Sequence, residues 1–304
     1  MLQLRALHRS IFQDPSFEGA LAPEALRGEA LERHANDTMQ SLRKERSRRG
    51  AAAGGLTRIG ATLDAALRTD AVEHMDEDGY PEKGKLGIAL GLHAMNVASA
   101  SYWRFFKELE PMLRRIHART GRAPRVLELA SGSGGFAFAL EKLARRAKLP
   151  LEVTASDVVP LYIERGAALA AKTGAKVTFR KIDALDMSGE PEGAYDVVFI
   201  AQSVHHFSPG QLARMIRESQ RVATTAFVSV DGFRSLGMVA FVAGTAILSL
   251  WPAMVHDAVI SVRKFYPEGE LEAIARMGAP KAKVKIGRIR PLNTVLSVRF
   301  DEGS

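Results

Sequence analysis

A single carboxylate followed by a glycine-rich turn is the first feature of this chain with clear chemical potential. Glu128 lies near the end of an apolar stretch at 126–130, and Gly132 and Gly134 follow shortly after it. Glycines let backbone N–H groups approach a ligand without interference from a Cβ atom. A carboxylate here would oppose a phosphate, but it suits a cation such as the ammonium group of a methionine moiety. The spacing Gly132-x-Gly134-x-x-Ala137 also satisfies the dinucleotide fingerprint, so the turn alone leaves NAD and other adenosyl ligands open.

Two further acids follow expected strands and extend the same ligand site. The pattern of residues 151–157 predicts a strand that ends in Asp157, whose acceptor-only side chain could take both hydroxyl protons of a ribose. NAD enzymes also bind the ribose hydroxyls with a carboxylate at this place, so Asp157 supports adenosyl binding in general. The next expected strand, 176–182, is followed by Asp183. A helix N-cap is the plain structural alternative for Asp183.

His205 and His206 are the candidate acid–base residues. They follow an apolar strand expected at 195–201, and open α/β sheets bind ligands at the carboxyl ends of their strands. A histidine with a pKa near neutrality is a common general base. Because adjacent side chains of an extended segment point in opposite directions, we expect only one of the two to face a substrate, and we expect no shared metal ion. Asp231, which ends the neighbouring strand 225–231, could orient and support an imidazolium, with a loop cap as the alternative.

The elements that position these residues form an α/β core preceded by helices. Residues 1–122 show helical spacing with almost no alternating pattern, and they predict a helical N-terminal extension before a core domain at 123–304. Residues 281–289 and 293–300 alternate between apolar and polar side chains. They predict a hairpin whose final strand runs antiparallel in the sheet.

An apolar insertion interrupts the core at about 233–265. Residues 236–255 carry no charged side chain and are long enough to cross a bilayer. Glycines and Pro252 interrupt the run, however, and a crossing would separate two strands of one sheet. We therefore expect no membrane span, and instead a buried helix pair over the site, an apolar acceptor pocket or a dimer interface. His256, directly after this run, is a second candidate base, with packing as its alternative.

With these motifs, residues 125–300 resemble the class I S-adenosylmethionine (SAM)-dependent methyltransferases, whose first motif has an acidic residue before a glycine-rich turn. The resemblance implies a Rossmann-like seven-stranded sheet with helices on both faces and an antiparallel last strand, which dinucleotide-binding sheets lack. It also implies that Asp183 accepts from the adenine amine, and that helices before the first strand form a lid over the pocket. The cofactor contacts that it implies are Glu128, Ala130, Gly132, Gly134, Asp157, Val158, Asp183, Ala184 and Gln202.

The end of the fourth strand indicates the kind of acceptor. Methyltransferases that act on amino groups of nucleic acid usually carry Asn/Asp-Pro-Pro-aromatic here, whereas residues 201–204 of this chain are AQSV. The ending VHHF at 204–207 is similar to small-molecule methyltransferases of quinone and natural-product biosynthesis. A nucleic-acid substrate is therefore not expected.

Composition bounds the remaining alternatives. The chain has 304 residues, of which 46% are hydrophobic, enough for a sizeable core. It has no cysteine, which excludes disulfides, thiolate metal sites and a cysteine nucleophile.

The net charge of +8 is spread along the chain except for a dense basic run at 43–49. A solvated helix end is the plain interpretation of this run, and attraction of anions is the alternative. No secretory signal is evident, so a cytoplasmic location is expected.

The sequence thus predicts an enzyme that transfers a methyl group from SAM to a small, apolar or aromatic molecule. A hydroxyl oxygen is the favoured acceptor, with carbon and nitrogen left open. The competing hypotheses are an NAD-dependent oxidoreductase and a SAM-binding protein of membrane surfaces or RNA. A homodimer is left open.

Overall fold

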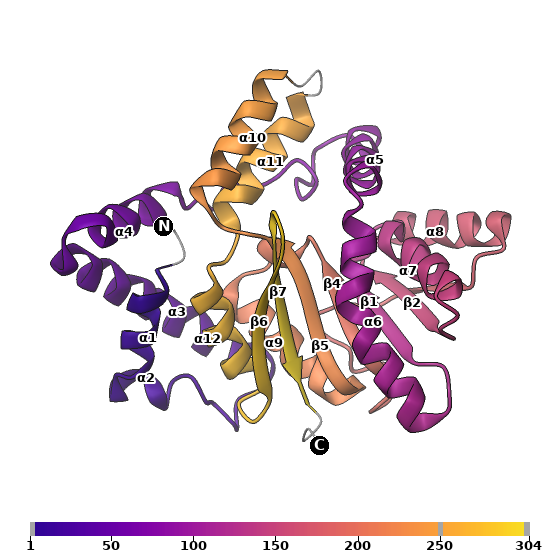
Figure 1. Cartoon of the computed structure of the whole chain (residues 1–304), viewed down its shortest axis with the longest axis horizontal. Coiled ribbons are helices and arrows are strands. Elements are labelled where there is room, and N and C mark those ends of the chain that lie inside the picture. The colour runs from indigo at the N-terminus through magenta and orange to yellow at the C-terminus, as the bar shows by residue number, and fades with distance from the viewer. Residues whose placement is uncertain (1–3, 249–251, 301–304) are drawn as a thin grey trace.

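The core of the protein is a seven-stranded sheet covered by helices on both faces (Figure 1). The structure is a computed structural model, and it describes residues 4–248 and 252–300. The strands lie in the order β3-β2-β1-β4-β5-β7-β6. Their bounds are β1 Arg125–Leu129, β2 Glu152–Asp157, β3 Val177–Lys181, β4 Tyr195–Ala201, β5 Ala223–Gly232, β6 Lys283–Ile289 and β7 Asn293–Arg299. The predicted fold class is confirmed.

The direction of the strands also agrees with the prediction. Neighbours among β1 to β5 pair in parallel, whereas β7 pairs antiparallel with both β5 and β6. The sheet therefore ends in the predicted hairpin with a reversed final strand. The strand order turns back between β1 and β4, and in open α/β sheets the crevice at such a switch point binds the ligand.

Helices precede the sheet and then alternate with its strands. Those before the sheet are α1 Arg5–Phe12, α2 Pro15–Glu18, α3 Gly28–Ala53, α4 Gly55–Leu67, α5 Glu82–Ala98 and α6 Ser101–Thr120. Those after β1 are α7 Gly135–Arg146, α8 Pro160–Thr173, a short 3-10 helix η1 Val204–His206, α9 Pro209–Val222, α10 Leu236–Leu248, α11 Pro252–Lys264 and α12 Glu268–Gly278.

Side chains of the central strands alternate between two hydrophobic cores. On β4, Val197 and Phe199 belong to the core that α6 and α7 cover, whereas Val198 and Ile200 belong to the core of α3, α9 and α12. All four side chains are fully buried. A parallel strand covered on both faces needs apolar residues at successive positions, which is why β4 was readable as a continuous apolar run. The helices before the sheet thus share the cores of the α/β unit.

The apolar segment forms two helices at the carboxyl ends of the strands. α10 and α11 pack against each other and stand beyond the sheet, on the same side as α5 (Figure 1); residues 249–251 of this segment lie outside the described residues. None of the described helices is both long and apolar enough to cross a bilayer. The expectation of a buried pair is only partly right, because Met238 is 8% exposed but Phe241 is 52% exposed. The pair projects past the edge of the sheet (Figure 1), and Met238 of α10 packs with Val262 of α11 and with Phe265 in a small cluster separate from the two main cores.

The basic run at 43–49 is only partly solvated, and it lies within a helix rather than at its end. Arg46 is 2% exposed, and its guanidinium donates to Glu270 at 2.5 Å and to Asp64 at 2.6 Å. Arg43 also donates to Glu270, at 2.8 Å. The run lies inside α3, whose inner face packs on α12, so helical periodicity turns part of the run inward.

Candidate functional site

Glu128 lies on β1 between β2 and β4, and it is 3% exposed. Its Oε2 accepts no hydrogen bond from any residue that the structure describes. Burial raises the pKa of Glu128 to about 8, although the Ala137 backbone N–H opposes this rise. A buried carboxyl group is costly unless a partner satisfies it. Glu128 is therefore suited to a cationic ligand group.

The turn after β1 is held in place by Asp157. The carboxylate oxygens of Asp157 accept from the backbone N–H of Gly132 at 2.9 Å and of Val159 at 3.0 Å. Gly132 and Gly134 have φ angles of 54° and 86°, a left-handed backbone that glycine adopts without strain. Burial raises the pKa of Asp157. The structure thus brings the turn and both acids, Glu128 and Asp157, to the carboxyl edge of neighbouring strands.

The other predicted cofactor contacts follow the carboxyl ends of β1, β2, β3 and β4. Ala130 and Gln202 follow the adjacent strands β1 and β4, and both have a left-handed backbone, with φ angles of 47° and 55°. Ala184 is buried, whereas Val158 and Asp183 are exposed. Asp183 accepts the backbone N–H two residues along at 2.8 Å. That contact is a local Asx turn, and it leaves the second carboxylate oxygen available to a ligand.

Side chains of α5 and α6, to which the sequence assigned no role, reach the same turn. Asn96 is 2% exposed and donates to Oε1 of Gln202 at 2.6 Å. The hydroxyl of Tyr102 lies 3.2 Å from Nδ1 of His93. A Cβ on Gly135 would come within 2.7 Å of that hydroxyl, so glycine is what lets Tyr102 approach the turn. The helices before the sheet therefore contact the glycine turn directly.

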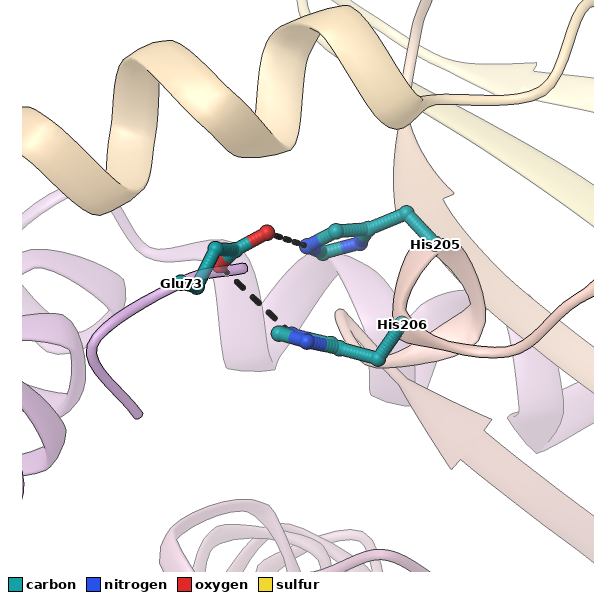
Figure 2. A group of neighbouring side chains, drawn as sticks. All are labelled: Glu73, His205 and His206. Atoms are coloured by element: carbon teal, nitrogen blue, oxygen red, sulfur yellow. Dashed lines mark ion pairs between the residues drawn. The ribbon is translucent and has the colours of Figure 1, made fainter. Parts of the chain in front are cut away.

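His205 and His206 lie side by side, contrary to the expected divergence (Figure 2). Their ring centroids are 4.3 Å apart, with 34° between the ring planes. The reason is local: the pair belongs to η1, a turn of 3-10 helix, and the alternation of extended chains does not apply there. Both rings extend toward Glu73. Divergence therefore does not oppose a shared ligand.

An aspartate fixes each ring through its Nδ1. Nδ1 of His205 lies 2.9 Å from Oδ2 of Asp231, which also accepts the His205 backbone N–H at 2.9 Å. Nδ1 of His206 lies 2.6 Å from Oδ2 of Asp76. Burial alone would raise the pKa of Asp76, but its hydrogen bond with His206 brings the pKa below the ordinary value. Asp231 is at the strand end where the sequence placed it, whereas Asp76 comes from the loop between α4 and α5.

Nε2 of each ring faces Glu73, a residue that the sequence did not indicate (Figure 2). The Nε2 atoms of His205 and His206 lie 3.6 Å from Oε1 and 3.8 Å from Oε2 of Glu73. Glu73 is 2% exposed, and burial raises its pKa. Ser261 donates to Oε2 at 2.9 Å, and Nζ of Lys264 lies 3.9 Å from Oε1. Glu73 sits in a loop without periodicity, so no sequence signal could have found it.

The structure places His256 in a different cluster. Its ring stacks on that of His74 with centroids 4.0 Å apart, and its Nδ1 lies 3.0 Å from Oδ1 of Asp257. Asp257 also accepts the backbone N–H groups of His74 at 2.8 Å and Met75 at 3.2 Å. His256 therefore ties α11 to the loop before α5, and the structure does not join it to the histidine pair.

Tyr162, on α8, is subject to charges from both the glycine turn and the histidine cluster. Burial raises the pKa of Tyr162, and the negative charges of Asp157 and Asp76 raise it further. The Tyr162 hydroxyl is thus within electrostatic reach of both carboxylates. The glycine turn follows β1 and the histidine pair follows β4, and these are adjacent parallel strands, so the two groups of candidate residues share one edge of the sheet.

Comparison with known proteins adds a family-level likeness. A family model described as a methyltransferase domain matches residues 126–225. The non-reducing polyketide synthase tazA of Aspergillus terreus (strain NIH 2624 / FGSC A1156) is 29% identical over 108 residues. That stretch is 33% of this chain but only 4% of the polyketide synthase.

Solved structures share the fold at low sequence identity. The plantazolicin methyltransferase BamL, in complex with a triazolic desmethylPZN analog and SAH, matches with a TM-score of 0.55 and 14% identity, over 79% of this chain and 97% of BamL. The plantazolicin methyltransferase BpumL, in complex with SAH, matches with a TM-score of 0.54 and 11% identity, over 87% of this chain and 98% of BpumL. These likenesses extend well beyond residues 126–225, and they concern the fold.

Proposed function

We propose, from the premise that this chain is a class I SAM-dependent methyltransferase, that it methylates a hydroxyl oxygen of a small apolar or aromatic molecule. The observation that carries the choice of oxygen is the histidine pair, held by carboxylates at the carboxyl end of β4. Methyl transfer to a hydroxyl requires loss of a proton, which a positioned imidazole can accept.

The residues around the glycine turn fit SAM. Bound SAM supplies a methyl group on a positively charged sulfonium. Glu128 would hold the ammonium group with the buried oxygen that no described residue uses, and Asp157 would accept from the ribose hydroxyls. Asp183 would accept from the adenine amine. NAD fits less well, because its pyrophosphate would meet the Glu128 carboxylate and its usual sheet lacks a reversed last strand.

Proton removal from the methyl acceptor would use His205, with Asp231 and Glu73 in support. Since Nδ1 of His205 donates to Asp231, its Nε2 is the basic nitrogen. The proton of the acceptor hydroxyl would pass to this nitrogen and the acceptor oxygen would bond to the methyl carbon, while the bond from that carbon to the sulfonium sulfur breaks and leaves a neutral thioether. Asp231 then stabilises the imidazolium. The carboxylate of Glu73, 3.6 Å away, favours the same charge.

Exposed apolar side chains support an apolar acceptor. α5 and α10 stand on the side of the sheet where the strands end (Figure 1). Leu90 and Met95 of α5 and Phe241 of α10 are 56%, 45% and 52% exposed. Large apolar side chains beside a site suit an apolar ligand. They would also suit a membrane surface, and flotation of the folded protein with liposomes is the result which that competing function predicts.

Methyl-labelled SAM offered with a panel of phenols and hydroxyquinones tests the proposal. A labelled methyl ether, identified by mass spectrometry, is the expected product. Label found only on carbon or nitrogen would keep the enzyme class and reject oxygen as the acceptor.

The variants Glu128→Gln and Asp157→Asn are each expected to weaken SAM binding about 10- to 150-fold. Each removes a charged acceptor from a buried ligand donor, a loss of about 1.5–3 kcal/mol. Titration calorimetry measures the change, and NAD is expected not to bind. Glu152→Gln is the matched control, because Glu152 is exposed at the opposite end of the strand that carries Asp157. Binding within about twofold of the parent in both folded variants would show that the site is misplaced.

SAM binding at pH 7 is expected to release close to one proton. The free protein holds a proton on Glu128 at this pH, because the pKa is about 8. An ammonium partner favours the ionised carboxylate, so binding expels that proton, and the release should diminish as the pH rises above 8. Calorimetry in buffers of different ionisation enthalpy counts the protons. Glu128→Gln should abolish the release, and a parent enthalpy independent of buffer would contradict the assignment.

A further inference from the structure

We infer that Glu73, His205 and His206 form a binding site for one divalent transition-metal ion of the zinc type. Two imidazoles and one carboxylate are a ligand set that catalytic zinc sites use, with a further position left open. One ligand atom from each of the three residues lies within 4.8 Å of the others. This site goes beyond the proposed methyl transfer, and ion binding can be measured without any acceptor.

The two rings are oriented as metal ligands are. Asp231 and Asp76 accept from Nδ1 of His205 and His206, so in the neutral rings the lone pair lies on Nε2. Both Nε2 atoms face Glu73 (Figure 2). Histidines that bind a metal commonly donate their other N–H to a carboxylate, which fixes the tautomer and raises the basicity of the ligating nitrogen. Both histidines have that partner.

The spacing of the ligand atoms matches a shared ion better than hydrogen bonds. The Nε2 atoms of His205 and His206 lie 3.6 and 3.8 Å from the Glu73 oxygens, too far for a hydrogen bond. Two ligands that each lie about 2.1 Å from a tetrahedral zinc ion are about 3.4 Å apart. Small side-chain adjustments would therefore place one ion between all three residues.

One oxygen of the buried Glu73 carboxylate lacks a hydrogen-bond donor among the described residues. Glu73 is 2% exposed, and its Oε1 accepts no hydrogen bond from the described part of the chain. Ser261 satisfies Oε2, and the ammonium of Lys264 stays 3.9 Å from Oε1. A buried carboxylate that faces two nitrogen lone pairs is repelled unless a proton or a metal ion lies between them. Doubly protonated rings are the alternative that the experiment below decides.

A second group of potential ligands, His74, His256 and Asp257, is less suited to a metal ion. The side chain of His256 is 45% exposed, and its Nδ1 faces Asp257. Asp257 already accepts two backbone N–H groups. This second group therefore supplies a control: His256→Ala removes a potential ligand there and leaves the Glu73 cluster intact.

An ion at the Glu73 cluster would act as a Lewis acid, and because it would occupy Nε2 of His205, it would replace the free imidazole in promoting loss of the acceptor proton. A hydroxyl placed at the open position would lose its proton more readily, as water does on zinc. This consequence rests on the proposed oxygen acceptor, whereas the site itself does not. Methyl transfer involves no oxidation, so a redox-inactive ion is sufficient.

Titration of the chelator-treated, dialysed full chain with Zn²⁺ and Co²⁺ tests the site. We expect one ion per chain by calorimetry, and a tetrahedral Co²⁺ absorption band. Glu73→Gln and His206→Ala should weaken Zn²⁺ binding at least about 100-fold. Asp231→Asn, which removes only the carboxylate behind His205, should weaken it about 10- to 100-fold. His256→Ala should leave the affinity unchanged. Circular dichroism verifies that each variant is folded. His206→Ala should disturb folding less than Glu73→Gln, because the His206 side chain is 20% exposed and the Glu73 side chain is 3% exposed.

Two results would overturn the site: no stoichiometric ion in the folded parent, or loss of binding with His256→Ala in place of His206→Ala. Methyl transfer that persists at full rate in excess chelator would show that the proposed function stands without the ion. Stoichiometric Zn²⁺ binding without any methyl transfer would support the site and count against the proposed function.

Discussion

Replacement of His205 with alanine is expected to reduce methyl-transfer turnover about 10²- to 10⁴-fold, the usual effect of removing a general base. SAM affinity should stay within about twofold, because Glu128 and Asp157 lie on the cofactor side of the site. The loss is expected whether the imidazole takes the acceptor proton itself or binds an ion that promotes its release. Turnover at saturating SAM and calorimetric SAM affinity, measured on the same preparation, give the two quantities.

The matched control is His117→Ala, because His117 is half-buried near the end of α6, far along the chain from η1, and its Nδ1 lies 2.9 Å from the Arg122 carbonyl. Full turnover in His205→Ala and His206→Ala, together with inactive His256→Ala, would move the base to α11. Full activity in all three variants would mean that positioning alone drives the transfer, and carbon or nitrogen would then be the better acceptor.

Replacement of Glu270 with glutamine is expected to lower the free energy of unfolding by about 3–5 kcal/mol, as loss of one partner from a buried ion pair does. Glu270 is fully buried on α12 and accepts from Arg43, Arg46 and Arg68. The first two belong to the basic run of α3. Glutamine keeps the shape and removes the charge, so three guanidinium groups lose one shared counter-ion, while Asp64 still pairs with Arg46 and Arg68. Urea unfolding, followed by circular dichroism, measures the loss.

The pH dependence of stability separates this effect from lost packing. Burial alone would raise the pKa of Glu270, but Arg68, Arg43 and Arg46 outweigh burial and hold the pKa well below its ordinary 4.5. A depressed pKa in the folded protein stabilises it above pH 4.5, and that stabilisation disappears as the pH falls through the folded value. The difference between parent and Glu270→Gln should therefore shrink in acid. Glu272→Gln is the control on the same helix, because its ion pair with Arg276 is exposed and contributes little. A difference that is independent of pH would point to packing.

Much of the fold could be predicted from local sequence. The predicted strand at 195–201 coincides with β4, and the alternating pattern at 281–289 and 293–300 gave the hairpin of β6 and β7. These patterns follow from burial on one or both faces of the sheet, because each strand has apolar residues at the positions that are buried. The glycine turn was also readable, because Gly132 and Gly134 can adopt the positive φ angles of the turn without strain.

The histidine cluster includes contacts that could not be predicted from local sequence. Asp231 could be placed near the histidine pair in advance because β4 and β5 are adjacent parallel strands whose ends meet, and the structure shows that its partner is His205. Glu73 and Asp76 could not be found, because they lie in a loop and reach the pair only through tertiary packing. A single turn of 3-10 helix, too short to leave a period in the sequence, then decided that both rings face one carboxylate.

The sequence by itself determined the sheet, its reversed last strand, the glycine turn and the acids at the strand ends, since each follows from the residues of one segment. Tertiary structure alone decided which distant groups meet. It turned Arg43 and Arg46 from a basic run into the partners of a buried carboxylate, and it set Glu73 against two imidazoles. Burial and charge pairing depend on what the rest of the chain brings within a few ångströms, and no short stretch of sequence records that.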